Sequence, residues 1–160
     1  MKIAKYLVII IFFASCKKQE CNNSIFEEYH EFKNETWRSD QPVNFLFDLN
    51  DSTKNHDISL RIRYNISEYP FQNIILISTG ELLDTFNIQL RDKQGFPKGK
   101  GVGDIREFEF FLACKKKLKS NKNNKLKIQY SMTNKNLAAG RLKKIKGINS
   151  LGLIILECYE

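Results

Sequence analysis

Histidine is scarce in this chain, and the arrangements that build catalytic or metal centres are missing. The sequence has 160 residues and 2 histidines, and neither His30 nor His56 lies in a His-Glu-x-x-His or paired-cysteine pattern. A zinc site is therefore not expected. A Cys114–His56 dyad is one alternative, but we expect His56 to be a surface residue in a loop. We predict that the protein is not an enzyme and holds no metal and no cofactor.

Proline and alanine are also scarce, whereas aromatic residues are plentiful. The chain has 3 prolines against 12 phenylalanines and 6 tyrosines, and 42% of its residues are hydrophobic. This composition excludes a disordered stalk and favours β-sheet over helix. The length that follows residue 15 suits one domain with one hydrophobic core, which we expect to span residues 25–160.

No apolar run in the chain reaches the roughly 20 residues that a membrane span needs. The N-terminal run Tyr6–Phe13 follows Lys2 and Lys5 and is followed by an Ala-Ser pair and Cys16. This order predicts a lipoprotein signal peptide over residues 1–15, with Cys16 as the first residue of the mature chain. A covalent diacylglyceryl group and further acylation of Cys16 would anchor the protein durably in a membrane. The alternative is an ordinary cleaved leader that happens to contain a cysteine.

Cysteine is scarce as well, with 4 residues in the chain. If Cys16 carries lipid, then Cys21, Cys114 and Cys158 remain, and an odd number leaves at least one thiol unpaired. Cys114 and Cys158 both lie near the edges of expected strands, so they would pair if those strands are neighbours. The sequence alone leaves the connectivity open.

Period-two alternation of apolar and polar residues dominates the rest of the chain. Expected strands lie at residues 43–48, 58–65, 73–78, 86–91, 108–112, 126–132 and 151–159. The segments at 73–78 and 151–159 are nearly all apolar, so we expect both faces of these strands to be covered. Short strands at this spacing predict an all-β fold, an antiparallel β-sandwich of jelly-roll or immunoglobulin-like type with seven or eight strands.

Three segments lack this alternation. Residues 16–24 are polar, which indicates a lipidated tether between the membrane and the domain. Residues 25–37 fit either one or two helical turns or a first strand. Residues 134–147 have helix-like spacing interrupted by Gly140, which indicates one short helix or a long crossing loop. We therefore expect at most one short helix.

Basic residues outnumber acidic ones, and the formal net charge is +8. The excess gathers in two clusters, at residues 115–127 and 141–146. Nucleic acid is not an expected partner, because the protein is predicted to be exported and no aromatic residue interleaves the lysines at 115–125. The clusters are either solvated loops or contacts with anionic lipid or polysaccharide.

A glycine-rich stretch at residues 95–103 invites comparison with a phosphate-binding loop. It fails the P-loop pattern, because no Ser or Thr follows a Gly-Lys pair at the required spacing. We expect these glycines to permit positive φ in a long connection between two strands.

Several short motifs occur in a distinctive order along most of the chain. They are an aromatic segment ending near Trp37, Arg61–Tyr64, Tyr69-Pro70-Phe71-Gln72-Asn73, Asp84–Ile88, Leu90-Arg91-Asp92, the glycines Gly99, Gly101 and Gly103, Ile145–Ile148 and Leu151–Leu153. In these motifs the chain resembles the GldH family of gliding motility lipoproteins of Bacteroidetes. It departs from the family pattern at Phe96-Pro97-Lys98, where the family usually has a tryptophan and an aliphatic residue.

The resemblance implies a non-enzymatic lipoprotein of the cell envelope. The implied partners are other lipoproteins of the gliding machinery and envelope proteins linked to type IX secretion. We expect the outer membrane facing the periplasm as the location, because Lys17-Lys18-Gln19-Glu20 lacks the acidic run associated with surface export. The candidate partner-contact loops are Tyr69–Asn73 and Lys98–Gly103, with Tyr69, Pro70, Phe71, Asn73, Gly99, Gly101 and Gly103 as the candidate residues.

Both loops have structural alternatives, with Tyr69 in the core, Pro70 fixing a turn and the glycines serving the backbone. Two other functions also stay open. The basic loops and surface-capable aromatics would suit a sandwich that binds envelope polysaccharide. Carboxylate pairs in the loops would be needed for a glycoside hydrolase.

Overall fold

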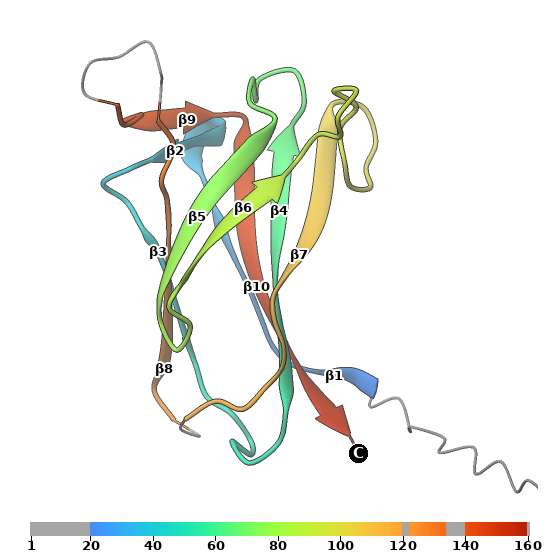
Figure 1. Cartoon of the computed structure of the whole chain (residues 1–160), viewed down its shortest axis with the longest axis vertical. Coiled ribbons are helices and arrows are strands. Elements are labelled where there is room, and N and C mark those ends of the chain that lie inside the picture. The colour runs from blue at the N-terminus through green and yellow to red at the C-terminus, as the bar shows by residue number, and fades with distance from the viewer. Residues whose placement is uncertain (1–19, 120–121, 134–139, 160) are drawn as a thin grey trace, which may run out of the picture.

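Two four-stranded antiparallel sheets face one another and form a β-sandwich (Figure 1). The computed structural model describes residues 20–119, 122–133 and 140–159. The expected all-β sandwich is confirmed, and in these ranges the only helical element is the 3-10 turn η1 (Lys33–Glu35). No helix in the described ranges has the length and apolarity to cross a bilayer. The expected leader and Cys16 lie outside the described residues.

The first sheet has the order β1-β10-β4-β7, and the second has the order β3-β8-β5-β6. The first sheet consists of β1 (Glu20–Glu31), β10 (Ile148–Tyr159), β4 (His56–Asn65) and β7 (Ile105–Lys116). The second consists of β3 (Val43–Phe47), β8 (Asn124–Tyr130), β5 (Asn73–Gly80) and β6 (Asp84–Gln89). A ribbon of β2 (Thr36–Arg38) and β9 (Lys144–Lys146) closes one corner. These two short strands raise the total in the described residues to ten, above the seven or eight expected.

The core lies between the inner faces of the two sheets. Strand β4 shows the predicted alternation: Ile58, Leu60, Ile62 and Tyr64 are at most 1% exposed. Opposite them, Val43, Phe45 and Phe47 of β3 point inward, and the intervening Asn44 and Leu46 are exposed. Each fully buried aliphatic or aromatic side chain contributes about 1.5–3 kcal/mol. Period-two alternation therefore fixes the register of each strand, because a slip by one residue would exchange its two faces.

The two strands that we expected to be covered on both faces behave differently. In β10 the prediction is confirmed, because residues 151–155 are all buried. In β5 it is wrong, because Ile74 and Leu76 are buried while Ile75 and Ile77 are only partly so. β10 is a central strand of the first sheet, and β5 has no further layer over its outer face within the described chain.

The segment after the expected lipidation site forms a long strand. β1 pairs antiparallel with β10 from Glu20↔Tyr159 to Glu31↔Ser150, so the strand alternative holds for residues 25–31. The strand also includes residues 20–24, which we expected to belong to the tether. Near the other undecided segment, a bridge joins Thr133 to Arg141 and β9 follows, with no helix in residues 140–147. Residues 134–139 lie outside the described residues.

One disulfide joins the first and last strands. Cys21 and Cys158 are register partners in β1 and β10, and their sulfur atoms are bonded. Cys114 is a free, exposed cysteine on β7. The alternative pairing of Cys114 with Cys158 is wrong, because β4 lies between β7 and β10 in the sheet.

A charged network covers the outer face of the first sheet. Arg61 Nη1 donates to Glu27 Oε1 at 3.2 Å and to the Tyr29 hydroxyl at 3.1 Å, and Arg61 Nε lies 3.6 Å from Glu109 Oε2. The hydrogen bond to Tyr29 is the main cause that raises the pKa of the Arg61 guanidinium. The Tyr29 ring lies over Gly152, where a Cβ would come 2.4 Å from Tyr29 Cε1. A glycine inside a central strand is thus covered by an aromatic ring from its neighbour.

Removal of the disulfide should destabilise the sandwich strongly. Residues Cys21 and Cys158 are 137 positions apart. In the chain-entropy description, closing a loop of this length lowers the entropy of the unfolded chain and stabilises the fold by about 5 kcal/mol. Removal of a native disulfide typically lowers the free energy of unfolding by about 2–5 kcal/mol. We expect Cys21→Ser/Cys158→Ser, or treatment with reductant, to lower the free energy of unfolding in urea by that range. Cys114→Ser is the matched control and should change it by less than about 0.5 kcal/mol. Equal stability of the double variant and the control would contradict the prediction.

Candidate functional site

Several of the sequence motifs meet at one end of the sandwich, whereas Asp84 lies at the other end, where β6 begins. At the first of these ends, the turn between β4 and β5 and the long connection between β6 and β7 lie together, beside the β2–β9 ribbon at the top of Figure 1. We call this end, formed by residues 65–73, 90–104 and 144–148, the loop end. The start of β1 and the end of β10 lie at the opposite end.

Tyr69 is a core residue of the loop end and not an exposed contact. Its side chain is 0% exposed and packs edge-on against Tyr64 and Phe71. Its hydroxyl donates to the carbonyl oxygen of Asn73 at 2.9 Å. Burial raises the pKa of the Tyr69 phenol well above its ordinary value. The structure therefore supports the alternative in which Tyr69 packs in the core.

The remaining candidates of this segment differ in exposure. Pro70 is exposed, Phe71 is half-buried against the core, and Asn73 begins β5. The Asn73 side-chain amide donates to Asn87 Oδ1 on β6. Among the candidate residues of this segment only Pro70 has an exposed side chain, and the neighbouring Gln72 is exposed as well.

Arg91 and Tyr64 join the two loops of this end. The Arg91 guanidinium donates to the carbonyl oxygens of Ile66 and Tyr69 in one loop and of Gly95 in the other. The Tyr64 hydroxyl donates to the carbonyl of Leu90 at 2.7 Å and lies 2.8 Å from that of Lys98. Hydrogen bonds from a charged group are worth about 1.5–3 kcal/mol. The motif Leu90-Arg91-Asp92 therefore holds the loops in place.

The glycines of the 95–103 stretch have two different roles. A Cβ at Gly99 would lie 2.4 Å from the carbonyl oxygen of Glu107, and one at Gly101 would lie 2.1 Å from that of Ile105. Between them, Lys100 and Glu107 exchange backbone hydrogen bonds of 2.9 and 2.8 Å. Gly103 has φ +62 and open space around it. Gly99 and Gly101 thus allow close backbone approach, and Gly99 and Gly103 also take the positive φ that we expected.

Two exposed apolar side chains of the loop end were missed by the sequence reasoning as contact candidates. Phe96 is 68% exposed and Val102 is 92% exposed. Both lie in the glycine-rich connection, which the network around Arg91 holds against the sandwich. The sequence did contain a signal for them. Each is an apolar residue among Gly, Pro and Lys, in a segment that shows no strand alternation to account for it.

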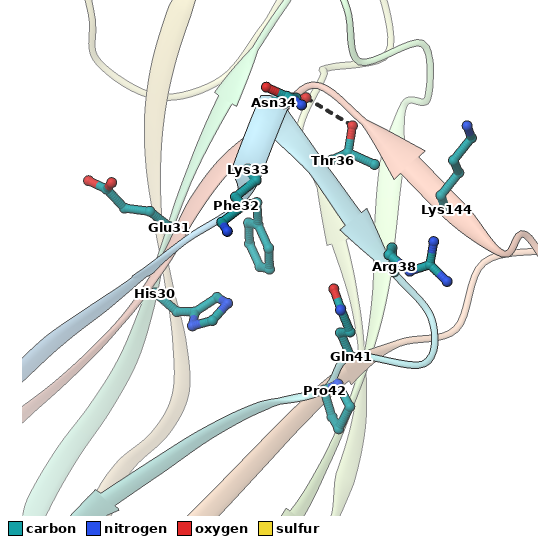
Figure 2. Close-up of a pocket in the computed structure, with 10 residues that line it drawn as sticks. All are labelled: His30, Glu31, Phe32, Lys33, Asn34, Thr36, Arg38, Gln41, Pro42 and Lys144. Carbon is teal, nitrogen blue, oxygen red and sulfur yellow. Dashed lines mark hydrogen bonds between the residues drawn. The ribbon is translucent and has the colours of Figure 1, made fainter.

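A pocket lies at the corner where β1 passes through η1 into β2 (Figure 2). It has a volume of about 740 Å³ and is lined by His30, Glu31, Phe32, Lys33, Asn34, Thr36, Arg38, Gln41, Pro42 and Lys144. Phe32 stacks on Trp37 at 4.8 Å, and Trp37 Nε1 donates to the Gln41 carbonyl at 2.8 Å. Asn34 and Glu35 both have positive φ, at 51° and 49°. The pocket is therefore an open depression above the stacked rings of Phe32 and Trp37, and most of the charged side chains that line it are basic.

The residues with catalytic potential do not form a reactive group. The prediction that His56 is a surface residue in a loop is wrong. His56 begins β4 and is 0% exposed, and burial lowers the pKa of its imidazole. Its ring nitrogens have no hydrogen-bond partner among the described residues, so no dyad with Cys114 is formed there. Cys21 and Cys158 lie near Asp57, but metal binding needs thiolates and these sulfurs form a disulfide.

A second shallow pocket of about 340 Å³ brings two carboxylates together, Glu35 and Glu68. Glu35 Oε1 accepts from Asn149 Nδ2 at 2.9 Å, and Glu35 Oε2 accepts from Asn65 Nδ2 at 3.2 Å. Both oxygens of Glu35 thus hold β4 and β10 to η1. Glu35 therefore has a structural role in this pocket, and Glu68 is the carboxylate that is exposed there.

The fold and the site define an all-β domain with a braced loop end. The family model described as GldH lipoprotein matches residues 24–155, and the chain belongs to this family, which is linked to gliding motility. It is 30% identical over 94% of its length to the gliding motility lipoprotein GldH homolog of Christiangramia forsetii, of which it covers 91%. It is 28% identical over 93% of its length to the gliding motility lipoprotein GldH of Flavobacterium johnsoniae, of which it covers 92%. No solved structure matches the chain significantly.

Two glycine variants should show whether stability depends more on the close approach of two backbone segments or on a positive φ. Gly101→Ala places a Cβ 2.1 Å from a backbone oxygen, whereas Gly103→Ala meets open space at φ +62. We expect Gly101→Ala to lower the free energy of unfolding by more than about 2 kcal/mol, because backbone must move. Gly103→Ala should cost about 1 kcal/mol, the usual penalty of the left-handed region. Equal losses in urea unfolding would show that the approach of Gly101 to Ile105 does not matter.

Tyr69→Phe should change how stability depends on pH. Burial raises the pKa of Tyr69 in the folded state above the value of about 10 in the unfolded chain. The stabilisation by the neutral phenol is therefore complete below pH 10 and is lost as the pH rises above it. At pH 7 we expect the free energy of unfolding of the wild type to exceed that of Tyr69→Phe by about 1 kcal/mol, because the variant lacks the hydrogen bond of the hydroxyl. Above pH 10 this difference should shrink. A difference that stays constant to pH 11 in urea unfolding would refute this.

Proposed function

We propose that this protein is a lipid-anchored, non-enzymatic subunit of the gliding machinery, whose loop end contacts other envelope proteins. The observation that carries the proposal is membership of the GldH family over residues 24–155. The finer parts of the proposal are lipidation at Cys16, attachment to the outer membrane facing the periplasm, and a link to type IX secretion. The sequence Lys17-Lys18-Gln19-Glu20 favours the periplasmic side, because it has no acidic run.

The positions of the two ends support this arrangement. β1 begins four residues after Cys16 and runs for 12 residues to the loop end. A strand of this length spans roughly 40 Å. A lipid on Cys16 would hold the start of β1 close to the bilayer and place the loop end well away from it. Partners anchored nearby or standing in the envelope would meet the loops first.

The contact surface we propose is made of exposed side chains on a rigid base. Phe96, Val102 and Pro70 are exposed on loops that Arg91 and Tyr64 brace. Large apolar side chains held in place suit a protein interface, because they bury area without a large cost in ordering. Gly99, Gly101, Tyr69 and Asn73 then act indirectly, by fixing the loops on which the contacts stand.

A non-enzymatic role agrees with the chemistry of the described side chains. His56 is buried, and both carboxylate oxygens of Glu35 accept amide hydrogens. Polysaccharide binding is the second candidate function, and the corner pocket favours it. The His30 and Phe32 rings pack together there, and Lys33 and Lys144 would suit an acidic sugar (Figure 2). Arg38 also lines the pocket, and its guanidinium pairs with Asp40 at 2.9 Å.

Deletion of the gene for this protein should abolish gliding. A variant gene should restore gliding in the deletion strain only if the surface of the loop end is intact. We expect the wild-type gene to restore cell movement on a surface, and Phe96→Asp/Val102→Asp to fail because a charge is placed in the contact surface. Both side chains are exposed, so the variant should fold normally. Spreading of colonies and secretion of substrates are the measurements.

Leu83→Asp is the matched control, because Leu83 is 83% exposed in the turn between β5 and β6, away from the loop end. It should restore gliding fully. A deletion strain that glides and secretes normally would end the proposal. Salt-sensitive binding of the purified protein to envelope polysaccharide, lost on Arg38→Gln, would instead favour the second candidate.

A further inference from the structure

The end of the sandwich opposite the loop end carries a dense group of lysines. Strand β7 ends at Lys116, and the chain continues toward β8 through Lys117 and Lys119. Lys115, Lys116, Lys117 and Lys119 are all exposed. None of the four forms an ion pair with another described residue. We call these four residues the lysine cluster.

Carboxylates at this end are already engaged within the fold. Glu157 Oε1 accepts from Lys54 Nζ at 2.7 Å, and Asp57 Oδ1 accepts from the backbone of Lys115 at 2.7 Å. Asp48 accepts from the backbone of Asn123, and Asp51 accepts from Thr53. Asp57 thus contacts the backbone of Lys115, but no carboxylate of the described residues forms an ion pair with a side chain of the lysine cluster.

Strand register places the lysine cluster near the start of the domain. Cys21 pairs with Cys158 across β1 and β10, the adjacent Glu157 pairs with His56 of β4, and His56 pairs with Lys116 of β7. These residues form one row across the first sheet. Three steps between neighbouring strands amount to about 14 Å. Lys116 thus lies about 14 Å from the point where the chain enters the sheet.

The chain before the sheet is short. Five residue steps separate Cys16 from Cys21, and five extended residues span at most about 18 Å. This step rests on the proposed lipid at Cys16. With that lipid in a bilayer, the tether is short enough for the row from Cys21 to Lys116 to lie along the headgroups, where surface charge acts on lysines within a Debye length of about 10 Å.

We propose that the lysine cluster is a second membrane contact, which binds an anionic lipid surface and sets the sandwich upright on it. The lipid at one edge of the sheet and the lysines at the other edge would form two separate points of attachment. Two points restrict tilting that a single flexible anchor permits. The loop end would then face away from the membrane in a defined orientation.

Vesicle binding by the mature chain with Cys16→Ser tests the lysines without the lipid. The probes are vesicles of phosphatidylcholine alone and vesicles that also contain phosphatidylglycerol. We expect binding only to the anionic vesicles, weakened by salt. A lysine near such a surface strengthens binding about fivefold, so Lys115→Gln/Lys116→Gln/Lys117→Gln/Lys119→Gln should weaken binding by about 600-fold if all four lysines reach the surface.

The control removes four charges from the basic group at the loop end, through Arg141→Gln/Lys143→Gln/Lys144→Gln/Lys146→Gln. All four side chains are exposed, and this variant should bind the anionic vesicles as well as its parent. Circular dichroism of both variants checks that the sheets are intact. Equal loss in the two variants, or no salt-sensitive binding by the parent, would overturn the proposal. Binding to an anionic polysaccharide but not to the vesicles would overturn it as well.

The lipid anchor is tested separately, by mass spectrometry of the mature N-terminus of the wild-type protein from native membranes. A lipidated Cys16 together with lysines that do not bind vesicles leaves the anchor standing and removes the second contact. An unmodified N-terminus removes the anchor, and with it the geometry that places the lysine cluster at the bilayer.

Discussion

The first and last strands of the sandwich pair with one another at ten register positions, and the other elements take their positions from this pair. β10 stands between β1 and β4, and its residues 151–155 are buried on both faces. The core covers its inner face, and side chains of its neighbours, such as Tyr29 over Gly152, cover its outer face. The Cys21–Cys158 disulfide locks the pair at one end, and Glu35 holds β10 at the other through Asn149. Without β10, β1 would have no neighbour and β4 would become an edge strand. The whole first sheet thus depends on the C-terminal residues.

At the loop end, buried groups determine what the exposed ones can do. Tyr69, Tyr64 and Arg91 satisfy backbone carbonyls of loops that have few regular hydrogen bonds of their own. Because these donors are fixed by the core, Phe96 and Val102 are presented in set positions. The residues that brace the loops and the residues that are exposed on them are therefore different side chains. A substitution of Phe96 or Val102 changes the surface of the loop end without removing a hydrogen bond that holds it.

The alternation of apolar residues predicted most strands and the sandwich, because half-buried strands of a two-layer fold need it. Alternation could not predict β2 and β9, which have three residues each, nor the start of β1 at Glu20. It also failed for β5, since an apolar run does not reveal which face has a partner. The cysteine pairing needed the strand order, which depends on contacts far apart in sequence. Tyr69 was a candidate contact residue with a core position as the alternative, and its burial was visible only once Phe71 and Tyr64 lay around it.

The disulfide between β1 and β10 also has a consequence for the order of events during export. A chain that crosses a membrane from its N-terminus delivers Cys21 well before Cys158, which follows 137 positions later. Until β10 arrives, β1 has no partner and the first sheet has no centre, so folding is dominated by long-range contacts and is slow. The Cys21–Cys158 bond therefore closes only after the last strand of the sheet has been delivered. During that interval the exposed Cys114 is the competing thiol for Cys21.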